Sequence, residues 1–243
     1  MNSRWLAIDT ATDLASVAVG TPPACESVTQ LAGQRVHAAA IVELVDRCLH
    51  PLGVRPADLA GIIVADGPGG FTGLRIGWAA AKGLAQERGL PLVAIPSLLA
   101  AASGAAAIMG AVPVATCIDA LRGEVFGAMY IVHRTHVETI VPPQVGTPAE
   151  LVARAPVRPR AVVADTAQHA LFAESWSGAS LLTAQMLRPA AASLLALKAC
   201  EGAGRSLEDL QAAEPDYGRL AEAQARWEAR HGRPLPDPSR ASG

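Results

Sequence analysis

The chain's architecture is most strongly indicated by the segment Asp66-Gly67-Pro68-Gly69-Gly70-Phe71-Thr72-Gly73-Leu74-Arg75-Ile76-Gly77. The apolar residues 61–66 predict a buried strand that ends on an aspartate, and a helical pattern follows the glycines. Thr72 is expected to cap the start of this helix, and Gly89 is expected to cap its end. A strand, a glycine-rich loop and a long helix in this order predict an α/β lobe.

The residues before this segment predict a hairpin and one more helix. Short apolar runs at 5–9 and 16–20 flank the polar turn 10–13, which is typical of two antiparallel strands. Apolar residues at helical spacing predict an amphipathic helix over 37–50. With a further strand at 92–95, the first lobe is expected to mix antiparallel and parallel pairing.

The same order of elements restarts near residue 112. A strand at 112–119 again ends on an aspartate, and a second strand at 124–133 follows a short turn. The sequence therefore predicts two similar lobes, although a chance recurrence of common elements is the alternative. Further strands are expected at 137–141, 161–164 and 181–182, and a helix at 190–200. The predicted division is a first lobe at 1–103, a second lobe at 104–214, a C-terminal helix at 215–232 and a disordered tail at 233–243.

Composition excludes several classes of protein. A net charge of -2 over 243 residues lacks the basic field of an autonomous nucleic-acid binder. The four cysteines are scattered without zinc-site spacing, which predicts reduced thiols and no metal. The start of the chain does not resemble a signal peptide, and the low-charge stretch 91–118 is interrupted by prolines and glycines. We expect a cytoplasmic protein without a membrane span.

Three groups of residues are candidates for chemistry. Asp9 and the hydroxyl residues after it could hold a magnesium-bound phosphate, or the aspartate could simply cap the hairpin. The loop 67–73 lacks the Gly-Lys-Ser/Thr of a phosphate loop, so a tight turn that brings the helix close to the sheet is favoured. Asp119 and Glu124 could be an acid/base pair, but a salt-bridged turn is the commoner arrangement. We predict no catalytic, cofactor or metal residue.

The helix after the glycine loop carries small or apolar residues around much of its circumference. One stripe is expected to face the sheet, which leaves a second surface. That surface is either buried within the same lobe or available to another chain.

Several segments together resemble one family, the TsaB-type (YeaZ-like) subunits of bacterial tRNA threonylcarbamoyladenosine biosynthesis, which are non-catalytic homologues of the TsaD/glycoprotease family. The matching segments, in chain order, are Leu6-Ala7-Ile8-Asp9-Thr10-Ala11-Thr12, Arg35-Val36-His37, residues 67–77, Ala81-Lys82-Gly83-Leu84-Ala85, Pro91-Leu92-Val93-Ala94-Ile95-Pro96-Ser97-Leu98, Asp119-Ala120-Leu121-Arg122-Gly123-Glu124-Val125, Pro215-Asp216-Tyr217-Gly218-Arg219 and Ala221-Glu222.

The resemblance implies an α/β, actin-like (ASKHA, RNase H-like) fold of tandem lobes with mixed sheets. It also implies a scaffold role in the complex that transfers threonylcarbamoyl to the adenosine next to the tRNA anticodon. The implied partners are the TsaD-type catalytic homologue and the TsaE-type ATPase. A homodimer is expected when the chain is alone, tRNA is expected only within the complex, and no membrane is involved.

The resemblance also supports a non-catalytic assignment. The catalytic homologue places two metal-binding histidines four residues apart, and the matching positions here are Ser97 and Ala101. Neither side chain replaces an imidazole as a metal ligand. The residues after Asp119 and those at 162–166 also lack the glycines that a nucleotide site in the second lobe would use.

The family's dimer is built from two helices of the first lobe. Carried over to this sequence, the contact role falls on Ala38, Val42, Val45, Leu49, Leu74, Arg75, Trp78 and Lys82. Trp78 is expected to be the main anchor of such an interface.

Two alternatives stay open. Asp9 and Thr10 favour a nucleotide-dependent kinase-like or a peptidase-like enzyme. A stand-alone homodimeric interaction protein would use the same two helices.

Overall fold

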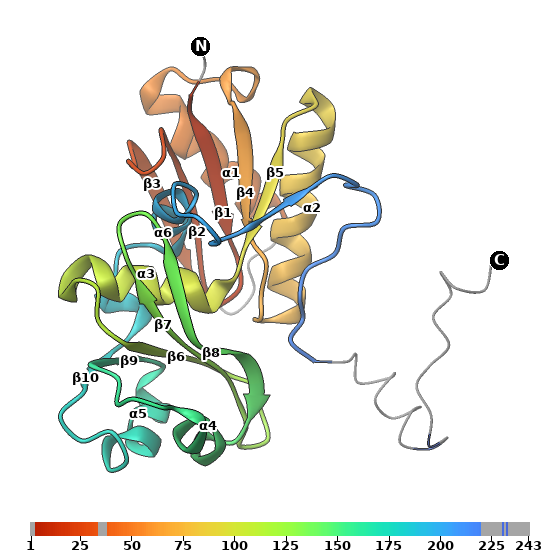
Figure 1. The fold of residues 1–243 in the computed structure, drawn as a ribbon. Helices are drawn as coiled ribbons and strands as arrows, with labels where there is room; N and C mark the ends of the chain where they lie inside the picture. The colour runs from red at the N-terminus through yellow and green to blue at the C-terminus, as the bar shows by residue number, and fades with distance from the viewer. Residues whose placement is uncertain (1–2, 34–37, 220–229, 231, 233–243) are drawn as a thin grey trace.

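The chain forms two β-sheets, one in each lobe, and helices cover both (Figure 1). The computed structural model describes residues 3–33, 38–219, 230 and 232. The predicted tandem lobes with mixed sheets are confirmed by this arrangement.

The first lobe contains a six-stranded sheet in the order β11-β5-β4-β1-β2-β3. Its strands are β1 (Trp5–Asp9), β2 (Leu14–Gly20), β3 (Ser27–Ala32), β4 (Gly61–Ala65), β5 (Leu92–Ile95) and β11 (Arg205–Leu207). Helices α1 (Ala38–Leu49) and α2 (Phe71–Arg88) pack on one face of this sheet, and α6 (Ala190–Leu197) packs on the other. Two short 3₁₀ turns are η1 (His50–Leu52) and η2 (Pro56–Asp58).

The second lobe contains a five-stranded sheet in the order β10-β9-β6-β7-β8. Its strands are β6 (Val114–Asp119), β7 (Val125–Val132), β8 (Val137–Gly146), β9 (Ala161–Val163) and β10 (Ser180–Leu182). Helix α3 (Ser97–Met109) packs on one face of this sheet. The other helical elements of this lobe are α4 (Pro148–Arg154), α5 (Thr166–Ala173) and η3 (Ala184–Met186).

The two sheets have the same topology. β1, β2 and β3 pair antiparallel, and β4 and β5 add parallel strands on the other side of β1. β6, β7 and β8 repeat the antiparallel part, while β9 and β10 repeat the parallel part. β11 is the one strand of the first sheet that has no counterpart among the described strands of the second.

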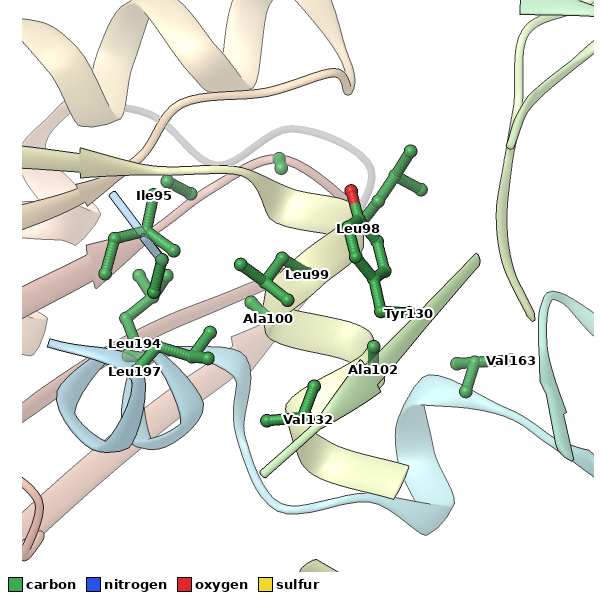
Figure 2. Packing of buried hydrophobic residues seen from close by; sticks show 14 of the residues in the cluster. Ile95, Leu98, Leu99, Ala100, Ala102, Tyr130, Val132, Val163, Leu194 and Leu197 are labelled. Atoms are coloured by element: carbon green, nitrogen blue, oxygen red, sulfur yellow. The ribbon is translucent and has the colours of Figure 1, made fainter. Parts of the chain in front are cut away.

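Helices α3 and α6 pack against each other between the two sheets, and their side chains form the core that joins the lobes. Figure 2 shows Leu99 and Ala100 of α3 on the side toward Leu194 and Leu197 of α6, while Leu98 lies beside Tyr130. Most of α3 is buried around its circumference, so its sequence has no polar face to mark it as a helix. This explains why residues 97–109 read as a featureless low-charge stretch.

Two further cores fill the outer sides of the sheets. Leu6, Ile8 and Ile62 pack beneath α1 and α2 in the first lobe. In the second lobe, Phe172 and Trp176 stack with ring centroids 5.0 Å apart. Each sheet is therefore covered on both faces, which explains the continuous apolar runs of β1 and β4.

Several boundaries differ from the predicted ones. Helix α2 begins at Phe71 with Gly70 as its N-cap, so Thr72 is not the cap. Residue 103 lies inside α3, and β11 returns to the first sheet before residue 214 because it pairs with β5. Residues 220–229 and 231 of the predicted C-terminal helix and all of the predicted tail lie outside the described residues.

Candidate functional site

A groove of about 670 Å³ lies between the lobes. Its first-lobe wall comes from the turn after β1 and from the start of α2, and its second-lobe wall includes Ile118, Asp119 and Asp165. A smaller cavity of about 90 Å³ lies next to it and is lined by Asp9 and by the first turn of α3. Of the strand-end aspartates in the sequence, Asp9 lines the smaller cavity and Asp119 lines the groove, whereas Asp66 lines neither.

Asp9 is the most deeply buried of these carboxylates, with 3% of its surface exposed. Its Oδ1 accepts a hydrogen bond from the backbone N–H of Ala11 at 2.9 Å. Burial raises the pKa of Asp9 to about 6, and the hydrogen bond from Ala11 opposes this change. Burial therefore makes the charged form of the Asp9 carboxyl group energetically unfavourable.

Thr10 and the glycine loop are occupied by contacts within the first lobe. The Thr10 hydroxyl donates to the carbonyl of Gly73 at 2.7 Å. The N–H of Gly70 donates to the carbonyl of Ala11 at 2.8 Å, and a Cβ at Gly69 would collide with that same carbonyl. The loop therefore lets the chain's own β1 turn approach closely, as the tight-turn interpretation predicted.

Asp119 and Glu124 do not form an acid/base pair with each other. Asp119 accepts from the N–H of Leu121 at 2.9 Å, which closes the turn after β6. Glu124 lies 3.8 Å from Arg219 instead. The salt-bridged alternative is the better description of this turn, with Arg219 as a partner of the glutamate.

The first turn of α3 faces the smaller cavity through Ser97 and Ala101. The Ser97 hydroxyl accepts a hydrogen bond from the N–H of Gly67 at 3.2 Å, so it fastens the glycine loop to α3. Among the described residues, neither cavity is lined by a histidine, and no cluster of three or more potential metal ligands occurs.

The residues predicted to contact a partner divide into two groups. Val45, Leu49, Leu74 and Trp78 are buried within the first lobe. Trp78 is 2% exposed, and its indole N–H donates to the carbonyl of Ala65 at 3.0 Å. These four side chains support the lobe's own core, which corrects the expectation that Trp78 is a surface anchor.

The other predicted contact residues lie toward the surface. Val42 is 68% exposed on α1. Arg75 is exposed on α2, where its guanidinium lies 4.1 Å from the centroid of the Phe71 ring. The Lys82 ammonium donates to the carbonyls of Gln211 and Ala213. Ala38 begins α1, and its side chain lies outside the described part of the chain.

Sequence reasoning missed two exposed positions on α2, Ala79 and Gly83. A Cβ at Gly83 would meet no atom within 4 Å, so this side of the helix is open. Helices α1 and α2 pack beside each other, and Val42 and Ala79 are both exposed. Helix α2 therefore has an exposed side with small residues, but Ala79 and Gly83 are not among the residues predicted to contact a partner.

The comparisons with known proteins place the chain in a family. The family described as TsaD, tRNA N6-adenosine threonylcarbamoyltransferase, matches residues 30–213. The protein named tRNA threonylcarbamoyladenosine biosynthesis protein TsaB of Bacillus subtilis (strain 168) is 31% identical over 207 residues, which cover 83% of this chain and 87% of the relative. The chain belongs to the TsaD family, as a TsaB-type member.

Two further relatives agree with this assignment. The TsaB protein of Escherichia coli (strain K12) is 36% identical over 148 residues, which cover 58% of this chain and 64% of that protein. The solved structure of YeaZ from Pseudomonas aeruginosa superposes with a TM-score of 0.74 at 27% identity and covers 88% of this chain and 99% of that one. The α/β fold of tandem lobes expected from the TsaB resemblance is confirmed by this superposition.

The TsaB-type relatives are named biosynthesis proteins rather than transferases. Within the described part of the chain, no helix is long and apolar enough to cross a bilayer.

Proposed function

We propose that this chain is a non-catalytic subunit of the machinery that makes threonylcarbamoyladenosine in tRNA, and that it pairs with a TsaD-type catalytic homologue. The names of its TsaB relatives support the pathway. The lining of the interlobe cavities supports the lack of a catalytic role.

The observation that carries this proposal is the pair Ser97 and Ala101. Both residues line the smaller cavity from one face of α3, four positions apart. Two histidines at this spacing would make a metal-binding pair, whereas a hydroxyl and a methyl group do not hold a catalytic metal. The resemblance implies two metal-binding histidines at these positions in the catalytic homologue, and this chain has a serine and an alanine there.

The surface for pairing is the exposed side of α1 and α2, where Val42, Ala79 and Gly83 lie. Small residues allow another helix to approach closely, and Val42 supplies apolar area to bury. The same surface would serve a homodimer when the chain is alone. A TsaE-type ATPase is the third proposed component, and tRNA is bound only by the assembled complex in the cytoplasm.

The kinase-like alternative rests on Asp9 and Thr10. The Thr10 hydroxyl is already bonded to Gly73, and Asp9 is buried and closely held by Ala11. These contacts favour a structural use of the turn over phosphate binding.

Depletion of the chain from its host tests the proposal. The content of threonylcarbamoyladenosine in bulk tRNA, measured by mass spectrometry of nucleosides, is expected to fall on depletion. Re-expression of the native chain should restore it, and Val42→Asp should restore it poorly because the substitution places a charge on the pairing surface. Unchanged modification after depletion would favour the stand-alone interaction protein.

A further inference from the structure

Residues 216–219 cross from the first lobe to the second. The chain leaves α6, adds β11 to the first sheet and then runs beside α2, where Lys82 holds the carbonyls of Gln211 and Ala213 (Figure 1). We call residues 216–219 the interlobe strap. Asp216 and Tyr217 contact the first lobe, Gly218 lies against both lobes, and Arg219 contacts the second.

The first-lobe end of the strap is fixed by backbone and side-chain contacts. The N–H of Asp216 donates to the carbonyl of Asp66 at 2.8 Å. The Tyr217 hydroxyl accepts a hydrogen bond from Arg75 at 3.0 Å, and its ring lies 4.9 Å from the ring of Phe71. Tyr217 is thus held on the start of α2.

The second-lobe end of the strap is fixed by Arg219. Its guanidinium donates to the carbonyl of Ala120, lies 3.8 Å from the carboxylate of Glu124 and sits 5.2 Å from the centroid of the Phe126 ring. A single side chain therefore joins the strap to the turn between β6 and β7.

Gly218 lies between the two lobes. Its φ of +69° belongs to the left-handed region that favours glycine. A Cβ at this position would come within 2.6 Å of the Phe126 ring in the second lobe and within 2.8 Å of Pro68 in the first. The strap passes through this contact with no room for a side chain.

The two loops that the strap joins continue into opposite walls of the interlobe groove. The loop after β4 leads to Gly70 and Phe71 on one wall, and the turn held by Arg219 begins at Asp119 on the other. We propose that the interlobe strap holds these walls at a fixed separation, so that the groove widens only when the second-lobe contacts of Arg219 break. This device belongs to the chain alone and does not depend on the proposed function.

Hydrogen exchange measured by mass spectrometry tests the strap in the full chain. Arg219→Ala is expected to accelerate exchange about tenfold or more in peptides covering 67–73 and 119–126, the change that follows loss of a hydrogen bond to a charged group. Exchange in β1 and β6 should stay as in the native chain. Arg158→Ala, at an exposed position of the second lobe that lines neither cavity, is the matched control.

Gly218→Ala is a second variant that disturbs the strap, because the added methyl group would collide with Phe126 and Pro68 in the two lobes. It is expected to accelerate exchange in the same two regions. Unchanged exchange of both regions in Arg219→Ala would overturn the proposal. An equal acceleration throughout the second-lobe sheet would also overturn it, because that pattern means general destabilisation rather than separation of the groove walls.

Discussion

Asp9 and Asp119 occupy equivalent positions in the two lobes. Each ends the first strand of its sheet, and each accepts a hydrogen bond at 2.9 Å from the backbone N–H two residues further on. Their surroundings differ, because Asp9 is buried and Asp119 is exposed. The same turn therefore occurs in both lobes, but of these two aspartates only Asp9 is buried away from solvent.

This burial makes stability depend on pH. The folded-state pKa of Asp9 is raised from 3.8 to about 6, so the folded chain binds more protons than the unfolded chain between these values. The stabilisation that Asp9 gives the folded chain is complete below pH 3.8 and is lost as the pH rises toward about 6. Asp9→Asn removes this loss and keeps an oxygen for the Ala11 N–H. We expect Asn to gain on the order of 2 kcal/mol relative to Asp between about pH 4 and pH 7.

Thermal unfolding of both proteins across this range measures the effect. The difference in Tm between Asp9→Asn and the native chain should grow as pH rises. A constant difference would mean that Asp9 does not change its ionisation in this window.

Two glycines of α2 should respond in opposite ways to alanine. A Cβ at Gly77 would collide with the Thr10 hydroxyl, so Gly77→Ala is expected to cost about 1–3 kcal/mol of unfolding free energy. Gly83 has open space around it, so Gly83→Ala should stabilise the helix by about 0.5–1 kcal/mol. Urea unfolding of the two variants compares them directly, and the same sign for both would contradict the close approach of α2 to the β1 turn.

Arg205 and Asp66 should be energetically coupled. Arg205 donates to both oxygens of the buried Asp66 carboxylate, at 2.9 and 2.8 Å. Arg205→Gln is expected to cost about 2 kcal/mol, because it leaves a carboxylate with little access to water. In a double-mutant cycle, the variant that carries both Arg205→Gln and Asp66→Asn should lose less unfolding free energy than the two single variants lose together. Additive losses would show that the pair contributes little to holding β11.

Substitutions of Trp78 and Val42 should have different effects on stability, because Trp78 is buried and Val42 is exposed. Trp78→Ala is expected to cost about 3–5 kcal/mol of unfolding free energy, because a buried ring and its hydrogen bond to Ala65 are lost. Val42→Asp should change the stability of the isolated chain by less than about 0.5 kcal/mol. Chemical denaturation checks both values, and a small loss for Trp78→Ala would mean that the ring is not part of the core.

The sequence predicted those elements whose patterns are local. The hairpin of β1 and β2, the glycine cap of α2 and the restart near residue 112 all appear in the structure. The helix α3 was missed because it is buried on most sides and shows no polar face. The helix α4 was also missed, although Thr147 and Glu150 form a capping box that was visible in the sequence.

The contact surface was harder to predict than the fold. Both stripes of α2 carry small or apolar residues, so periodicity alone did not decide which one faces the sheet. The size of Trp78 favours an anchor for a partner, whereas its indole N–H donates to the carbonyl of Ala65 within the lobe. The return of β11 was also beyond local patterns, because a three-residue strand depends on its partner β5.

The central claim is that the chain works by pairing through the exposed side of α1 and α2. The most direct test is a calorimetric titration of the purified chain with its TsaD-type partner, with the native chain and Val42→Asp measured side by side. We predict saturable binding by the native chain and an affinity weaker by about tenfold or more for the variant. No binding by the native chain, or equal affinity for both proteins, would contradict the account.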